Sequence, residues 1–151
     1  MSASQQQLQE LSQRLQEIQE QIEILQGAVE DVRARQTDID EAVTALESIE
    51  TDSTVQVPLG GGAYVRATIE DVEEVIVELG ADYAAELERD RATDALENKK
   101  DRLDDRIDEI TEQISQLESE STQLEGQAQQ IQQQAMQQQM QQMQQGRDPD
   151  E

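Results

Sequence analysis

The sequence lacks the side chains on which most catalytic and redox chemistry depends. Its 151 residues include no cysteine and no histidine, so it has no thiolate nucleophile, no imidazole base and no disulfide framework. No serine stands in a recognisable nucleophile motif, and the many carboxylates lie on solvated helical patterns rather than as a matched catalytic pair. We therefore expect no catalytic residues, no metal site and no cofactor, and we predict that the protein is not an enzyme.

Large apolar side chains are also scarce. Phenylalanine and tryptophan are absent, only 34% of the residues are apolar, and no apolar run is long enough to cross a bilayer. The first residues, MSASQQQ, lack the basic and apolar parts of a signal peptide, so we expect a cytoplasmic protein. A compact core is difficult to build from this composition, whereas long helices that bury a narrow stripe, completed by partner chains, suit it well.

Positive charge is the third scarcity. The chain has 11 basic residues against 35 acidic ones, which gives a net charge of -24. This sign disfavours nucleic-acid binding through phosphates and attraction to an anionic membrane surface. Such a composition is typical either of disorder or of a halophilic protein, for which ~1 M salt shortens the Debye length to about 3 Å and screens self-repulsion. The regular heptads favour the halophilic interpretation.

Two long stretches of heptad repeats flank the middle of the chain. Apolar residues recur every three and four positions within residues 1–52, where Gln36 is the polar interruption, and they predict an N-terminal coiled-coil helix. The same spacing returns in residues 88–135, interrupted at Lys100 and Ser121, and predicts a C-terminal coiled-coil helix. Residues 136–151 form a Gln/Met-rich tail with an acidic end, which we expect to be partly disordered.

The segment between the helices, residues 53–87, has the pattern of strands. Apolar and polar residues alternate over 55–59, a triple glycine follows, and residues 64–69 resume the strand composition, so a β-hairpin is predicted. The triple glycine is followed by Ala-Tyr-Val and not by the Lys-Ser/Thr of a phosphate-binding loop, which favours a structural turn.

Residues 69–79 are ambiguous, because their apolar residues also have helical spacing. The β-branched run at 75–77 favours a third strand over 75–79, with a turn at 80–82 and a fourth strand over 83–87. Two hairpins result. Isolated hairpins are marginally stable in water and leave unpaired edges, so we expect the insert to pair with strands of other subunits.

The predicted fold is therefore an α protein with a small β insert, in which two helices pair as an antiparallel coiled-coil hairpin around two central β-hairpins. Matching the helix ends next to the insert places Leu8 opposite Gln130 and Ile22 near Gln116. Both termini then meet at one tip. A seam between two helices cannot hide apolar side chains on all sides, so this tip should keep accessible apolar surface.

The segments at 57–65 (VPLGGGAYV) and 75–83 (VIVELGADY), flanked by heptad helices, resemble those of archaeal prefoldin alpha subunits. The resemblance covers nearly the whole chain, and an insert long enough for two hairpins points to the alpha class. It implies a heterohexamer of two alpha and four beta subunits whose hairpins join in an oligomeric β-barrel. It also implies an ATP-independent chaperone that binds unfolded client proteins and delivers them to a group II chaperonin.

On this interpretation two sets of residues carry the function. The client-binding set lies at the predicted tip and comprises Leu8, Leu11, Leu124, Ile131, Met136, Met140 and Met143. The assembly set lies in the insert and comprises Val55, Val57, Tyr64, Val65, Val75, Val77 and Tyr83. Two alternatives stay open: the methionines are plain filler on a fraying helix, and the whole protein is a structural coiled-coil spacer or dimerisation protein without chaperone activity.

Overall fold

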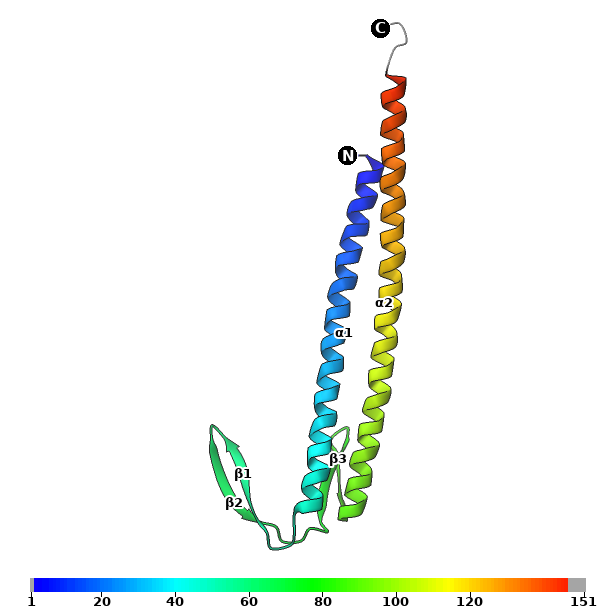
Figure 1. Cartoon of the computed structure of the whole chain (residues 1–151). Helices are drawn as coiled ribbons and strands as arrows, with labels where there is room; N and C mark the ends of the chain where they lie inside the picture. Colours follow the sequence, from blue (N-terminus) through cyan, green and yellow to red (C-terminus); the bar gives the residue numbers. More distant parts are fainter. Residues whose placement is uncertain (1, 147–151) are drawn as a thin grey trace. The chain divides into compact units, whose positions relative to one another are not determined.

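The computed structural model describes residues 2–146, and its elements follow the predicted order of helix, two hairpins and helix (Figure 1). The elements are α1 (Ala3–Ser48), β1 (Thr54–Gly60), β2 (Ala63–Thr68), β3 (Val75–Gly80), β4 (Tyr83–Leu87) and α2 (Arg89–Gln145). The chain divides into two compact units, which we name the terminal unit (residues 1–29 and 109–151) and the central unit (residues 30–108). The disorder predicted for the acidic end falls on residues 147–151, which lie outside the described residues.

In the terminal unit, segments of α1 and α2 lie antiparallel and bury a stripe from each helix. The heptad pattern places Ile18, Ile22 and Ile110 in this seam, and all three are buried. Gln21 and Gln116 line one groove between the helices, in agreement with the predicted register. The helix α1 begins where the Ser2 hydroxyl accepts a hydrogen bond from the Gln5 amide, so Ser2 acts as its N-cap.

In the central unit, the polar interruptions of the two heptad stripes each make hydrogen bonds to the facing helix. The Gln36 side-chain amide donates to the backbone oxygen of Lys100 (3.1 Å) and to Oδ1 of Asp104 (2.6 Å). The Lys100 ammonium lies 2.8 Å from Oδ1 of Asp40, and this hydrogen bond raises the pKa of Lys100. A polar layer of this kind specifies which residues face each other, because a shifted register would leave these groups without partners.

The first hairpin pairs β1 with β2 in antiparallel register. Val57 faces Val65, and Val55 faces Ala67. At the base of the hairpin the Asp52 amide donates to the oxygen of Ile69 (2.8 Å), and the Ile69 amide donates to the oxygen of Ser53 (2.9 Å). These bonds close the base of the hairpin, where its strands join the segments that lead to α1 and to β3.

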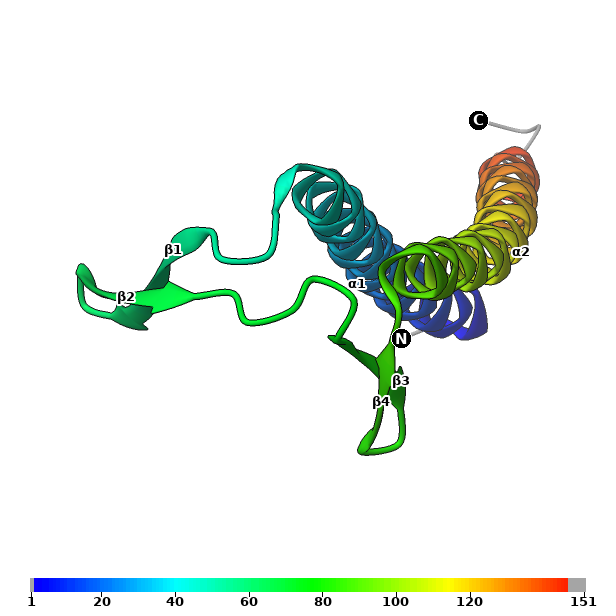
Figure 2. The same cartoon turned by 90° about the horizontal axis from the view of Figure 1, so that it is seen from below.

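The second hairpin pairs β3 with β4 and packs on the helix ends of its own unit (Figure 2). Val77 is buried against Leu46 of α1 and Ala92 of α2, and Val75 packs at the edge of this cluster. The strand interpretation of 75–79 is thus confirmed over the helical alternative. The carboxylate of Glu73 accepts a hydrogen bond from the Arg89 amide at the start of α2, where the helix dipole favours negative charge.

Candidate interaction surfaces

Apolar side chains remain exposed on the first hairpin. We define the hairpin face as Val55, Val57, Val65 and Ala67, whose cross-strand pairs share one side of the β1–β2 ribbon. Val57 keeps 40% of its surface exposed, although a valine in a two-sided sheet would be covered. Leu59 extends the same alternation and is also exposed. Water is an unfavourable neighbour for these groups, so the face is suited to association.

The other side of the same ribbon is more polar. Gln56 pairs with Arg66, and Pro58 pairs with Tyr64, whose ring is largely exposed. A tyrosine combines an apolar ring with a polar hydroxyl, and such side chains are enriched at protein interfaces. Among the predicted assembly residues, Tyr64 therefore lies on the other side of the ribbon from the hairpin face.

The assembly residues of the second hairpin lie in different environments. Val77 is 4% exposed and Val75 packs beside it, so both side chains serve the core of their own chain. Tyr83 is exposed at the β3–β4 turn. Sequence reasoning missed the exposed Ile76 and Leu79, because the run at 75–77 is apolar on both faces and alternation gives no signal for which face is covered.

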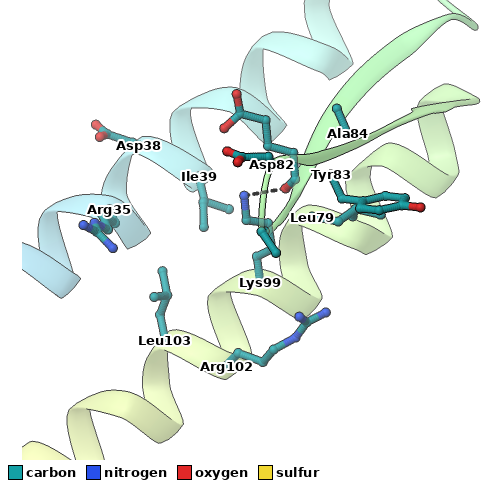
Figure 3. A pocket seen from close by; sticks show the side chains of 13 residues that line it. Arg35, Asp38, Ile39, Leu79, Asp82, Tyr83, Ala84, Lys99, Arg102 and Leu103 are labelled. Atoms are coloured by element: carbon teal, nitrogen blue, oxygen red, sulfur yellow. Dashed lines mark hydrogen bonds between the residues drawn. The ribbon is translucent and has the colours of Figure 1, made fainter.

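A hollow of about 870 Å³ lies between the end of this hairpin and the two helices of the central unit (Figure 3). Its lining combines apolar Ile39 and Leu103 with basic Arg102. The Lys99 ammonium donates to the backbone oxygen of Glu78 at 2.7 Å and so ties β3 to α2. This bond explains why the end of the second hairpin stays near the helices.

The predicted tip residues fall into two groups. Leu8, Leu11, Leu124 and Ile131 are half-buried in the helix seam of the terminal unit, where Leu11 and Ile131 line one groove with Arg14. The Arg14 guanidinium donates to Glu120 at 3.0 Å, and this hydrogen bond raises the pKa of Arg14.

The second group consists of Met136, Met140 and Met143, which we call the methionine face. Their side chains are 64%, 66% and 77% exposed. They lie on a part of α2 that continues beyond residue 135, where we placed the end of the coiled-coil segment, and that ends at Gln145. In the terminal unit this part of α2 extends past the beginning of α1 (Figure 1).

Two other kinds of site were sought in residues 2–146. No group of three or more His, Cys, Asp or Glu side chains in this range has a metal-binding arrangement. None of the helices described is both apolar and long enough to span a bilayer. Two acidic residues of α2 take part in contacts between helices: Asp104 with Gln36, and Glu120 with Arg14.

The chain is similar in sequence to known proteins. The family model described as prefoldin subunit matches residues 4–146. The prefoldin subunit alpha of Halorubrum lacusprofundi is 61% identical over 101 residues, which cover 67% of this chain and 66% of that protein. Its counterpart from Halobacterium salinarum is 66% identical over 96 residues, covering 64% of this chain and 62% of the relative. In each relative the match spans less than two thirds of its own length.

A solved structure is similar in fold. The cryo-EM structure of filamentous PFD from Methanocaldococcus jannaschii superimposes with a TM-score of 0.68 and 24% sequence identity. The superposition covers 76% of this chain and 97% of that one. Two long helices joined through small hairpins are thus a known arrangement, and the similarity extends over nearly the whole of the other chain.

Proposed function

Since the chain belongs to the prefoldin family, we propose that it is an alpha-class subunit of an ATP-independent chaperone. It assembles in the cytoplasm with beta-class subunits into a heterohexamer of two alpha and four beta chains. This complex holds unfolded client proteins and delivers them to a group II chaperonin, without enzyme activity and without nucleic acid or membrane as a partner. The observation that carries the proposal is the high identity to alpha subunits of halophilic archaea, 61% over 101 residues in one and 66% over 96 residues in another.

Assembly is assigned to the insert. The hairpin face exposes Val57 and Val65 on a ribbon with unpaired outer edges, and both features are satisfied when strands of neighbouring subunits close a β-barrel. Tyr64 and Tyr83, which are exposed, are assigned to the rim of the same contacts. Val75 and Val77 act through the position of the second hairpin, because they are covered within their own chain.

Client holding is assigned to the terminal unit. Leu8, Leu11, Leu124 and Ile131 offer partly covered apolar stems, and the methionine face adds flexible, polarisable side chains that adapt to many partners. Each arm alone binds weakly. Several arms acting on one unfolded chain raise the overall affinity through effective concentration, and release then requires no nucleotide.

The decisive experiment mixes the chain with a beta-class subunit from a halophilic archaeon in molar salt and measures the mass of the product. A heterohexamer that suppresses aggregation of a denatured client supports the proposal. A homodimer that does not suppress aggregation of the client overturns the proposal and supports the alternative of a coiled-coil spacer.

A truncation locates the activity within the complex. Removing residues 1–11 together with 127–151 should abolish client holding while the mass of the hexamer falls only by the deleted segments. Full suppression of aggregation by this truncated complex would contradict the assignment of client binding to the terminal unit.

A further inference from the structure

The methionine face is the main concentration of sulfur in the chain. The protein has four methionines and no cysteine. Three of the four lie within eight residues at the end of α2, and the fourth, Met1, lies outside the described residues. Spacings of four and three residues place Met136, Met140 and Met143 on one side of the helix.

The apolar character of this segment depends on these thioethers. After Ile131, the described part of the chain contains only glutamines besides the three methionines, Ala135 and Gly146. Every residue from 136 to 146 is exposed, so no packed core supports or hides the sulfur atoms. A chemical change at sulfur therefore alters the surface directly and leaves the buried seam at Ile18 and Ile110 intact.

We propose that Met136, Met140 and Met143 form a reversible oxidation site, at which hydroperoxides switch the methionine face from apolar to polar. The sulfur lone pair attacks the terminal peroxide oxygen, the O–O bond breaks and an S–O bond forms. The sulfur loses two electrons, and the peroxide leaves as water or as an alcohol after taking up the proton. A methionine sulfoxide reductase reverses the step with two thiols, which yields the thioether, a disulfide and water.

Two observations favour this site over a passive surface. Cysteine thiolates are the other common protein target of peroxide. The chain has no cysteine, so no thiolate within it competes with the methionines for the oxidant. In addition, the 64–77% exposure of the three side chains admits both a small oxidant and the active site of a repair enzyme. A sulfoxide is polar and chiral, and it no longer fits the apolar groups of an unfolded client.

The functional consequence rests on the proposed chaperone role, whereas the chemistry does not. The alpha chain is oxidised alone with hydrogen peroxide and then assembled with untreated beta-class subunits, so that sulfur in the partner does not contribute. Peptide mass mapping should find one added oxygen on each of the three methionines. The amount of complex needed to halve client aggregation should rise by about 3-fold or more, because contacts from two arms are lost from a multivalent grip.

Matched variants separate sulfur chemistry from shape. Replacing all three residues (Met136→Leu, Met140→Leu, Met143→Leu) gives an apolar face without sulfur, and peroxide treatment should not change the client holding of this variant, whatever its level before treatment. Replacing them with glutamine should reproduce the oxidised state without any oxidant. Treatment of the oxidised wild type with a thiol and the two methionine sulfoxide reductases, one for each sulfoxide epimer, should restore both the mass and the holding activity.

The outcomes distinguish the two proposals. If the untreated complex fails to hold clients, the proposed function is wrong, whatever peroxide does. If the untreated complex holds clients and the three sulfurs resist oxidation, or are oxidised with no change in holding, the oxidation site is refuted. Equal loss in the leucine variant refutes it as well, since the damage then lies elsewhere.

Discussion

The two hairpins of the insert have nearly the same chemistry but different surroundings. Each presents an apolar face built from cross-strand pairs: Val57 with Val65 in the first, and Val77 with Ala85 in the second. Val57 is 40% exposed and Val77 is 4% exposed. The difference arises because the second face rests on Leu46 and Ala92 at the helix ends, whereas no described element covers the first.

This contrast assigns different roles to similar strands. A face that the chain covers itself contributes to the stability of the subunit, because burial of apolar area is the main favourable contribution to folding. A face left open contributes only when another chain covers it. The second hairpin therefore belongs to the fold of the subunit, and the first is the part that assembly should stabilise.

The largest effect is expected where the second hairpin docks. Val77→Asp places a carboxylate in the cluster of Leu46 and Ala92 and should lower the free energy of unfolding by about 3 kcal/mol or more. The control Ile76→Asp changes the neighbouring residue, which is 73% exposed, and should change the free energy by less than about 0.5 kcal/mol. Chemical denaturation of the free chain at fixed molar salt, followed by circular dichroism, measures both. Equal losses in the two variants would remove the distinction between the faces.

The opposite pattern is expected for the first hairpin. Val65→Asp should leave the unfolding of the free chain unchanged but raise the concentration for half-assembly by about 100-fold, as for a central interface residue. Gln56→Asp introduces the same charge on the more polar side of the ribbon and serves as the control. Analytical ultracentrifugation with the beta-class partner gives the comparison. A complete hexamer from Val65→Asp at ordinary concentrations would contradict our assignment of the hairpin face.

The sequence predicts the elements of this insert well but not their coverage. The β-branched run at 75–77 and the turn after it located the fourth strand at 83–87, and β4 runs from Tyr83 to Leu87. Strand-forming sequence is present in both hairpins, so it carries no information about which one rests on the helices. That depends on Leu46 and Ala92, which are distant in sequence and are brought together only by helix pairing.

For the helices, too, the sequence predicted the pairing but not all of the contacts. Matching the helix ends next to the insert predicted the antiparallel register, and the heptads identified Gln36 as a polar residue in the apolar stripe. Its two hydrogen-bond partners, Lys100 and Asp104, were not predicted, because rotamers and the local approach of the helices decide what an amide reaches. The helix α2 continues to Gln145, into the Gln/Met-rich segment for which we expected partial disorder, since such a composition resembles that of disordered tails.

A smaller effect is expected at the two hairpin turns, which have similar backbone conformations but different sequences. Gly61 and Gly62 have φ values of 62° and 83°, and the corresponding Ala81 and Asp82 have 50° and 61°. A left-handed conformation costs an L-residue about 1 kcal/mol, and restriction of the unfolded chain by the added Cβ offsets part of this cost, so Gly61→Ala should destabilise the first hairpin by about 0.5 kcal/mol. No atom would contact the added Cβ within 4 Å, which leaves backbone strain as the cause.

The matched change in the second turn should act in the opposite direction. Ala81→Gly relieves the strain and should stabilise the docked hairpin by about 0.5 kcal/mol, after the loss of unfolded-state restriction is subtracted. Amide hydrogen exchange of the strand residues reports each hairpin separately. Faster exchange in the second hairpin after Ala81→Gly would mean that its turn is not strained.

The smallest effect is expected for the hydrogen bond that connects the second hairpin to α2. Lys99 and Lys100 are adjacent, but the Lys99 ammonium donates to Glu78 of β3, whereas that of Lys100 donates to Asp40 of α1. Lys99→Met should therefore accelerate amide exchange in β3 slightly, by a free energy of about 0.5 kcal/mol, because the bond is open to solvent. Lys100→Met should leave β3 unchanged.

The Lys100–Asp40 pair should also respond to pH. Asp40 raises the pKa of Lys100, so the contribution of this pair to stability is complete below the pKa of an unfolded lysine and is lost as pH rises through the higher folded value. Because both partners are exposed, molar salt should screen the contribution of the pair at every pH. Exchange in β3 that follows the Lys100–Asp40 pair instead of Lys99 would show that the helix pairing, and not the bond to Glu78, holds the second hairpin in place.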